Sequence, residues 1–255
     1  MSGFAELSPS AHPKSAPVED LPTPREILGR KVYVFGDGGR PVYALHELPG
    51  FTPKFIHFCR ALSGKGFTLY APLLFGKAGE RATYRNLTRA SFSPDWYVLK
   101  NATPRIIGEL RRIADAIQAE QRKPMGAIGM CFTGQLPVAL LDRPYIQAAV
   151  LSQPSMPFGK KDGLGLDDAD VAAGKRSGVP IIAFRFQGDK TSPEPRRQAF
   201  KDTFQGQIRF EAKPGNQHAV LTEALFDGAG KMQIGTPAAQ AFDETVIYLN
   251  DRLKT

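Results

Sequence analysis

The sequence predicts an α/β fold with a mostly parallel central sheet and helices on both of its faces. Strand-like and helix-like segments alternate from about residue 31 to the C-terminus. Helices between consecutive strands imply right-handed crossovers, which place the strands side by side in parallel. The length of 255 residues and the hydrophobic fraction of 42% suit one such domain with a full core.

The N-terminal segment differs in composition from the rest of the chain. Residues 1–25 are rich in Pro, Ser and Ala and show no period, so we expect an arm that precedes a single domain at residues 26–255. Two short apolar segments, 31–35 and 41–46, lie on either side of a Gly-Asp-Gly-Gly sequence at 36–39. A glycine-rich turn between two such segments predicts a β-hairpin.

Apolar periodicity and turn signals predict the remaining elements. The clearest is an amphipathic helix at 103–122, with Ile106, Leu110 and Ile113 on one stripe, whereas residues 75–102 have no clear period. The other expected elements, in chain order, are a helix at 52–65, a strand at 67–74, a strand at 125–130 followed by a short helix to about 141, a strand at 147–152, a helix at 167–176, a strand at 179–186, a helix at 192–204, a strand at 208–212 and a helix at 237–253.

Composition argues against several classes of function. The formal net charge of +8 comes from Lys and Arg scattered among acidic residues, a pattern of solvated surfaces, so we expect no nucleic-acid partner. No stretch has the apolar length of a membrane span, and residues 1–25 lack the apolar core of a signal peptide. Cys59 and Cys131 have neither a disulfide pattern nor metal spacing. We therefore expect a cytoplasmic monomer or homodimer without metal or organic cofactor.

A candidate nucleophile lies at the end of the predicted strand 125–130, where the sequence reads Gly-Met-Cys-Phe-Thr-Gly with the cysteine at position 131. Sites in parallel α/β sheets lie at the carboxyl ends of strands. A nucleophile between small residues, at a strand-to-helix turn, is typical of a nucleophile elbow. The N-terminus of the following helix favours a thiolate there. Taken alone, Cys131 could equally be a buried structural cysteine.

Two further strand ends supply the partners of such a nucleophile. Asp189 follows the predicted strand 179–186, and His218 follows the last predicted strand. The order nucleophile, acid, histidine is that of the α/β-hydrolases. Asp189 could instead cap the next helix, but Ser192, directly before Pro193, has the better N-cap pattern and leaves Asp189 free. We therefore expect Cys131, His218 and Asp189 to act as nucleophile, base and orienting acid.

From about residue 31 onwards, the chain resembles the dienelactone hydrolase family, cysteine hydrolases of the α/β-hydrolase fold. The motifs that carry the resemblance are His46-Glu47-Leu48-Pro49-Gly50, Tyr70-Ala71-Pro72, the cysteine elbow, Gly188-Asp189 and His218. A cysteine in the elbow, together with a glutamate just past an early strand, makes the match fairly specific.

The resemblance implies roles for three more residues. Glu47 would touch the resting thiol, be displaced by a substrate carboxylate and then take the thiol proton, so that the Cys131 thiolate forms only with substrate bound. Like-charge repulsion gives this arrangement a physical basis, since a nearby carboxylate disfavours a thiolate. Glu47 could also be an exposed loop charge. The resemblance places the oxyanion hole at the backbone N–H groups of Leu48 and Phe132, each typically worth about 3 kcal/mol in the transition state.

The chain departs from the family pattern within the elbow. Thr133 stands where the family usually has glycine, so we expect a more crowded elbow and a shifted oxyanion loop. Pro137 falls in the helix after the nucleophile, where it removes a hydrogen bond and should kink or shorten that helix.

The chain also departs from the pattern in substrate recognition, for which the family uses two arginines to bind a carboxylate. Lys77 and Thr222 occupy these positions, so a guanidinium fork is replaced by an ammonium and one charge is lost. Arg81 or Arg85 could compensate from the long loop, and Trp96 is a candidate for lining the pocket.

These features predict a cysteine-dependent hydrolase of a small carboxylic ester or lactone that works through a thioester acyl-enzyme. Two alternatives stay open. One is an esterase for neutral esters that needs no substrate carboxylate. The other is a non-catalytic binding protein with a hydrolase-like fold, which the departures at Thr133 and Pro137 would permit.

Overall fold

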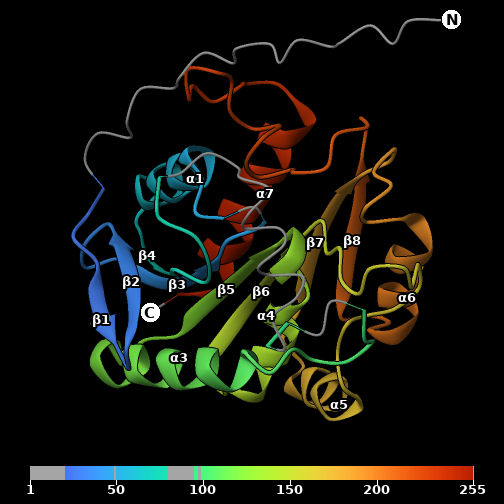
Figure 1. The fold of residues 1–255 in the computed structure, drawn as a ribbon, viewed down its shortest axis with the longest axis horizontal. Coiled ribbons are helices and arrows are strands. Elements are labelled where there is room, and N and C mark those ends of the chain that lie inside the picture. The colour runs from blue at the N-terminus through green and yellow to red at the C-terminus, as the bar shows by residue number, and fades with distance from the viewer. Residues whose placement is uncertain (1–20, 49, 80–94, 97–98, 255) are drawn as a thin grey trace, which may run out of the picture.

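The computed structural model describes residues 21–48, 50–79, 95–96 and 99–254. In this part of the chain a single sheet has the strand order β1-β2-β4-β3-β5-β6-β7-β8 (Figure 1). The strands are β1 (Arg25–Ile27), β2 (Arg30–Phe35), β3 (Arg40–Leu45), β4 (Phe67–Pro72), β5 (Met125–Met130), β6 (Ile146–Ser152), β7 (Ile181–Phe186) and β8 (Ile208–Lys213). β2 pairs antiparallel with β1 and β4, and every other pair is parallel. The predicted α/β fold with a mostly parallel sheet is confirmed.

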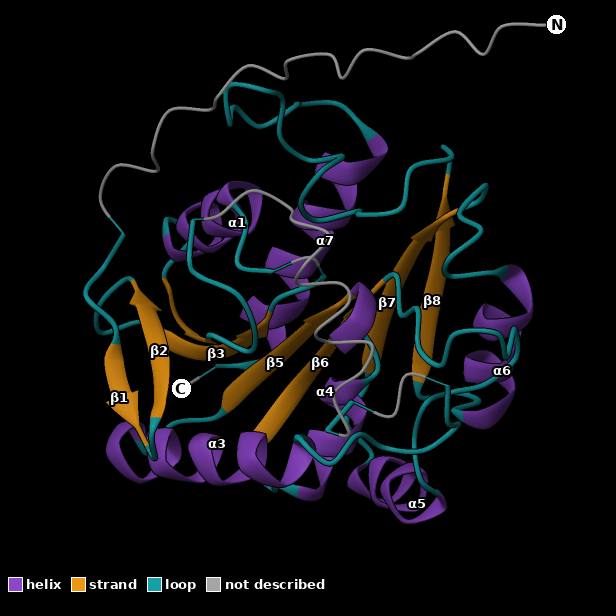
Figure 2. Cartoon of the chain, in the orientation of Figure 1, coloured by secondary structure: helices purple, strands orange, loops and turns teal. Residues whose placement is uncertain are grey.

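Helices cover both faces of this sheet (Figure 2). The helices are α1 (Pro53–Ser63), α3 (Ile107–Gln121), α4 (Leu136–Ala139), α5 (Asp168–Ser177), α6 (Glu194–Thr203) and α7 (Pro237–Arg252). Side chains of α1 and α7 pack in one hydrophobic core, and those of α3, α4, α5 and α6 pack in a second core against the opposite face. Because both faces are covered, the central strands are mostly apolar, and all residues of β5 and β7 are buried.

The predicted hairpin between residues 31–35 and 41–46 is wrong. β4 lies between β2 and β3, pairing antiparallel with the first and parallel with the second. The glycine-rich turn crosses the start of β4 at very close range, since a Cβ atom on Gly36 would lie 2.6 Å from the carbonyl oxygen of Phe67. The glycines are needed for this close approach, not for a two-residue hairpin turn.

β1 was not expected from the sequence, because it has three residues of which two are exposed. Arg25, the last residue of the predicted arm, already belongs to it and pairs with Val32. Its guanidinium also bonds the Glu120 carboxylate of α3 at 2.7 Å. The arm at residues 1–20 lies outside the described residues.

The helical segment after Cys131 is short and divided, as Pro137 led us to expect. It consists of a 3₁₀ turn at Cys131–Thr133, the four-residue α4 and a second 3₁₀ turn at Leu140–Asp142. Pro137 lies in the first turn of α4, where its missing N–H has no intrahelical partner to lose.

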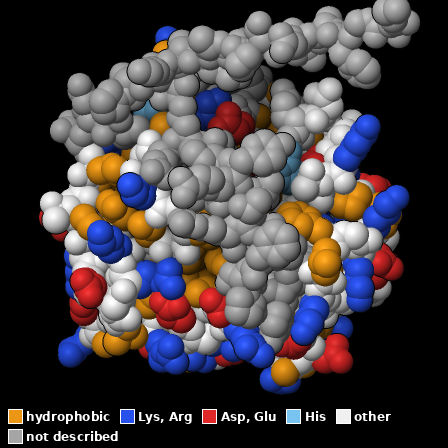
Figure 3. Space-filling model, viewed as in Figure 1, with side chains coloured by type: hydrophobic (Ala, Val, Ile, Leu, Met, Phe, Trp, Pro, Cys, Tyr) orange, Lys and Arg blue, Asp and Glu red, His pale blue; other side chains and the backbone are white. Residues whose placement is uncertain are grey.

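The surface charges are dispersed. Among the described residues on the face shown in Figure 3, Lys and Arg side chains lie interspersed with Asp and Glu side chains. Several of them form ion pairs, including Arg143 with Asp115 and Lys213 with Glu244. None of the described helices combines the length and the apolar content of a transmembrane span.

Candidate active site

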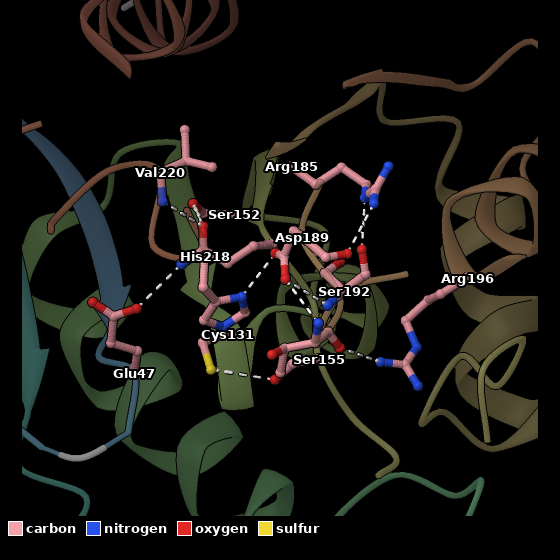
Figure 4. Close-up of polar contacts among 12 residues, drawn as sticks. Glu47, Cys131, Ser152, Ser155, Arg185, Asp189, Ser192, Arg196, His218 and Val220 are labelled. Carbon is pink, nitrogen blue, oxygen red and sulfur yellow. Dashed lines mark hydrogen bonds and ion pairs between the residues drawn. The ribbon is translucent and has the colours of Figure 1, made fainter. Parts of the chain in front are cut away.

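Three carboxyl ends of strands bring the predicted catalytic residues together. Cys131 directly follows β5, Asp189 lies in the loop after β7, and His218 lies in the loop after β8. Figure 4 shows the imidazole of His218 between the Asp189 carboxylate and the Cys131 sulfur.

The backbone at Cys131 has the geometry of a nucleophile elbow. Cys131 has a φ of 52°, in the left-handed region that non-glycine residues rarely adopt. A Cβ atom on Gly129 would lie 2.2 Å from the carbonyl oxygen of Thr133, and one on Gly134 would lie 2.6 Å from Cα of Pro154. Both flanking positions therefore require glycine, and the strained turn presents the Cys131 side chain at the sheet edge.

The Asp189 carboxylate is buried and uses both oxygens. Oδ2 lies 2.7 Å from Nδ1 of His218, whereas Oδ1 accepts the backbone N–H groups of Thr191 at 2.8 Å and Ser192 at 3.1 Å. The expectation that Ser192 caps the next helix is wrong: Pro193 is the N-cap residue, and the Ser192 hydroxyl has no partner among the described residues. Asp189 thus shapes its own loop while it orients His218.

Two buried arginines hold this loop in place, and the sequence analysis did not identify them. Arg185 donates three hydrogen bonds to backbone carbonyl oxygens, those of Ser192 at 2.6 Å, Asp189 at 3.0 Å and Gln187 at 3.1 Å. Arg196 likewise donates to the carbonyl oxygens of Pro157 at 2.7 Å, Gly163 at 2.9 Å and Thr191 at 3.3 Å. An arginine inside the apolar run Ile-Ile-Ala-Phe-Arg-Phe of β7 was the available signal, since a buried charge requires several hydrogen bonds.

The charge state of His218 is set by its neighbours. Burial lowers the pKa of His218, but the negative charge of Cys131 and the Asp189 carboxylate together raise it to about 11. Nε2 of His218 is buried and makes no hydrogen bond with any described residue. Cys131 nevertheless lies near enough for its charge to raise the pKa of His218. The arrangement favours the charged imidazolium form of His218.

Ser155 is a further contact of Cys131 that the sequence analysis missed. It lies in the loop after β6, with its hydroxyl oxygen 3.2 Å from the Cys131 sulfur. Its backbone N–H donates to the Cys131 carbonyl oxygen at 3.0 Å, and the residue is fully buried. The signal available in the sequence was its place just past a strand that neighbours β5.

Thr133 connects the elbow to the strand that leads to Glu47 and Leu48. Its hydroxyl accepts the N–H of Met130 at 3.0 Å and lies 3.0 Å from the carbonyl oxygen of Leu45 at the end of β3. The threonine therefore fits the elbow by forming bonds that glycine cannot form.

One of the two expected oxyanion donors lies in the elbow, and the other lies in the turn after β3. The Phe132 N–H directly follows Cys131, and the Leu48 N–H lies in the turn after β3. Neither N–H group donates in the loop and turn hydrogen bonds of the described residues.

His46 fixes the turn that carries Leu48, a role that the sequence analysis did not assign to it. The ring is fully buried, with Nε2 accepting the N–H of Leu74 at 2.9 Å and Nδ1 3.1 Å from the Glu47 carbonyl oxygen. Burial lowers the pKa of His46 to about 4, so the ring is neutral at physiological pH.

Comparison with known proteins agrees with this geometry. The pattern of the dienelactone hydrolase family matches residues 37–232. The chain belongs to the dienelactone hydrolase family. A search of curated proteins gives no match.

Solved structures of hydrolases share the fold. A putative dienelactone hydrolase from Klebsiella pneumoniae is 16% identical, with a TM-score of 0.64 over 86% of this chain and 92% of that one. An esterase from Pyrococcus furiosus is 13% identical, with a TM-score of 0.61 over 88% of each chain. A cold-adapted esterase from an Arctic intertidal metagenomic library is 20% identical, with a TM-score of 0.56 over 91% and 92%. At these identities the likeness shows the fold alone, which is that of the α/β-hydrolases.

Glu47 lies apart from the position that the dienelactone hydrolase pattern led us to expect. Its buried carboxylate accepts hydrogen bonds from Gln153 Nε2 at 3.1 Å and from the Thr222 hydroxyl, and it makes no hydrogen bond with Cys131. Burial raises the pKa of Glu47, while the Thr222 bond and the charge of His218 oppose that rise. Thr222, at the position of the family's second arginine, thus holds Glu47 instead of leaving an empty place.

The predicted substrate-binding residues have different surroundings. Trp96 is buried, and its ring centroid lies 4.8 Å from that of Phe132 and 5.7 Å from that of Phe75, so it packs against the residue that follows Cys131. Lys77 is exposed and forms no ion pair with any described carboxylate. Arg81 and Arg85 lie outside the described residues.

The other cysteine, Cys59, is a core residue, and the described side chains form no metal site. Cys59 is fully buried on the apolar side of α1, and burial raises the pKa of its thiol well above the ordinary value. Among the described residues, no three His, Cys, Asp or Glu side chains are grouped so that they could hold a metal ion.

Proposed function

We propose that this dienelactone hydrolase family member cleaves a small carboxylic ester or lactone through a thioester formed on Cys131. The observation that carries the proposal is the left-handed elbow at Cys131, next to a His218 ring that is bonded to the buried Asp189 carboxylate at 2.7 Å. A nucleophile, a base and a group that orients the base meet there in the chain order of an α/β-hydrolase.

The acylation step uses each group once. The Cys131 sulfur attacks the ester carbonyl carbon, a C–S bond forms, and the carbonyl electron pair moves onto oxygen. The Leu48 and Phe132 N–H groups stabilise that oxyanion. Collapse breaks the ester C–O bond, and the leaving oxygen takes the proton from Nε2 of His218.

The deacylation step reverses these roles with water. Nε2 of His218 takes a proton from a water molecule that attacks the thioester carbon. Collapse of the second tetrahedral intermediate breaks the C–S bond, releases the carboxylic acid and returns the sulfur as thiolate. Asp189 holds the same imidazole tautomer throughout and stabilises the charged form.

A specific observation favours the neutral-ester alternative over a substrate with a free carboxylate. Both Glu47 oxygens are engaged, by Gln153 and by Thr222. A substrate carboxylate would have to displace a buried group from two hydrogen bonds, and a threonine hydroxyl offers it no charge in return. We therefore place neutral esters and lactones first as substrates.

The nucleophile is tested by intact-mass spectrometry after reaction with 4-nitrophenyl acetate. We expect one acetyl group on Cys131 in the wild type and in Cys59→Ala, and none in Cys131→Ala, which should also lose turnover. Full turnover by Cys131→Ala would overturn the proposal. An intact wild-type protein with neither adduct nor turnover, across several activated esters, would support the non-catalytic binding protein.

The substrate class is tested with phenyl acetate and 4-acetoxybenzoate, which differ by one carboxylate. We expect kcat/KM for the neutral ester to equal or exceed that for the charged one. A preference of more than about 100-fold for 4-acetoxybenzoate, on the order of 3 kcal/mol in the transition state, would restore the carboxylate-triggered mechanism.

A further inference from the structure

The loop after β6 places a buried hydroxyl directly on the nucleophile. The Ser155 oxygen lies 3.2 Å from the Cys131 sulfur, within reach of an O–H···S hydrogen bond. The backbone fixes this contact, because the Ser155 N–H donates to the Cys131 carbonyl oxygen at 3.0 Å and that oxygen also accepts the Gly134 N–H at 3.0 Å. Figure 4 shows Ser155 and His218 approaching the sulfur from different sides.

The donors and acceptors at this point decide the direction of the bond. Among the described residues the Ser155 hydroxyl has the Cys131 sulfur as its one partner, and Nε2 of His218 has none. If the thiol donated to Ser155, the hydroxyl proton would lack an acceptor and Nε2 would stay unsatisfied in a buried place. If Ser155 donates to the sulfur, its hydroxyl proton has an acceptor, and the thiol proton remains available to the nearby Nε2 of His218.

We propose that Ser155 is a further catalytic residue, whose hydroxyl donates a hydrogen bond to the Cys131 thiolate. The inference rests on the proposed role of Cys131 as nucleophile. A hydrogen bond to the charged form of an acid stabilises that form, so Ser155 keeps the sulfur ionised before substrate arrives. The carboxylate of Glu47, held by Gln153 and Thr222, does not occupy this place.

The same bond acts on both halves of the reaction. In acylation the sulfur lone pair forms the C–S bond, the negative charge passes to the carbonyl oxygen, and the Ser155 bond weakens. In deacylation the C–S bond breaks and its electron pair returns to sulfur, where the hydroxyl again donates. Ser155 therefore promotes the departure of the thiolate from the second tetrahedral intermediate, and no proton leaves Ser155 in either step.

The experiment measures the rate of Cys131 alkylation by iodoacetamide between pH 5 and 10, followed at the Cys131 peptide by mass spectrometry so that Cys59 does not contribute. Ser155→Ala should shift the midpoint of this profile upwards by about one pH unit or more, a tenfold change in the thiolate equilibrium. Ser155→Thr keeps a hydroxyl and should shift the midpoint less. Thr245→Val is the matched control, because it removes a buried hydroxyl that bonds only the α7 backbone, and it should leave the profile unchanged.

A second measurement reports the deacylation step. With 4-nitrophenyl acetate, Ser155→Ala should carry a larger steady-state fraction of acetyl-enzyme than the wild type, and it should lose the acetyl group more slowly once the ester is removed. An unchanged or lowered alkylation midpoint in folded Ser155→Ala, judged by circular dichroism, would mean that the thiol donates to serine and would overturn the inference. If Ser155→Ala unfolds, an unchanged midpoint in folded Ser155→Gly has the same meaning. Alkylation does not depend on ester turnover. If the Ser155→Ala midpoint shifted in a protein that hydrolyses no ester, the hydrogen bond from Ser155 would be supported and the proposed function would be refuted.

Discussion

Replacing Thr133 by valine should both destabilise the fold and slow ester turnover, because one hydroxyl serves the nucleophile elbow and the oxyanion turn. The Thr133 side chain is fully buried. Its oxygen accepts the Met130 N–H at 3.0 Å and can donate to the Leu45 carbonyl oxygen at 3.0 Å. Valine fills the same space, so the substitution removes these bonds without leaving a cavity.

The size of the effect follows from these bonds. The Met130 N–H loses this acceptor in a buried place, which costs about 1 to 3 kcal/mol, and the donated bond contributes about 1 kcal/mol more. We therefore expect the free energy of unfolding to fall by about 2 to 4 kcal/mol. Thr133→Ser is the matched control, because it keeps the hydroxyl and loses one buried methyl group, worth about 1 kcal/mol.

Urea unfolding followed by circular dichroism measures the stability, and kcat/KM with phenyl acetate measures the activity. The elbow and the turn that carries Leu48 lose a direct tie in Thr133→Val, so kcat/KM should fall by about tenfold or more, whereas misplacing one oxyanion donor completely costs about 10²- to 10³-fold. Thr133→Ser should stay within about threefold of wild type. Equal stability and equal kcat/KM in the two variants would refute the reasoning.

Three further outcomes are expected. Asp189→Asn can keep the loop bonds but loses the charge beside His218, so kcat should fall by about 10³- to 10⁴-fold, and a loss below tenfold would contradict the orienting role. Glu47→Gln should leave iodoacetamide alkylation of Cys131 within about twofold of wild type, because the carboxylate does not bond the sulfur; a tenfold acceleration would restore the gate. The pKa of His46 is lowered to about 4, so its contribution to stability is present above pH 6.5 and is lost as the pH falls towards 4. We expect the free energy of unfolding to fall by about 3 kcal/mol between these pH values, as measured by urea unfolding at both. If a His46→Asn protein showed the same pH dependence, His46 would not be its cause.

The features that the sequence predicted correctly are those with a local cause. The strand that ends at Cys131 is a short apolar run, and the small residues beside it are required by contacts within the turn itself, such as that of Gly129 with the Thr133 carbonyl oxygen. Asp189 and His218 likewise follow strands whose β-type composition is evident. A topology rule then places all three at one edge of the sheet.

The features that the sequence did not reveal depend on contacts between distant segments. Pairing of β2 with β4 instead of β3 is decided by the whole sheet, and the glycine-rich turn suits either connection. Ser155 gained no attention because a serine in a loop is ordinary until its distance to Cys131 is known. The Ser192 prediction followed the common pattern for helix starts, but the helix begins one residue later, with Pro193 as its N-cap, and the Ser192 N–H instead donates to Asp189.

The departures from the family pattern become coherent when the charges around the sulfur are considered together. A glutamate that swings between a thiol and an arginine needs a free position and a cation to receive it. Here Thr222 supplies a hydroxyl in place of the cation, and with Gln153 it holds the Glu47 carboxylate in one position. If Cys131 is the proposed nucleophile, fixed groups have to stabilise its thiolate, and among the described residues Ser155 contacts the sulfur and His218 lies within range of its charge. We therefore propose that the fixed hydroxyl of Ser155 takes over the part of a mobile glutamate, and on this proposal the alkylation rate of Cys131 depends on Ser155 and not on Glu47.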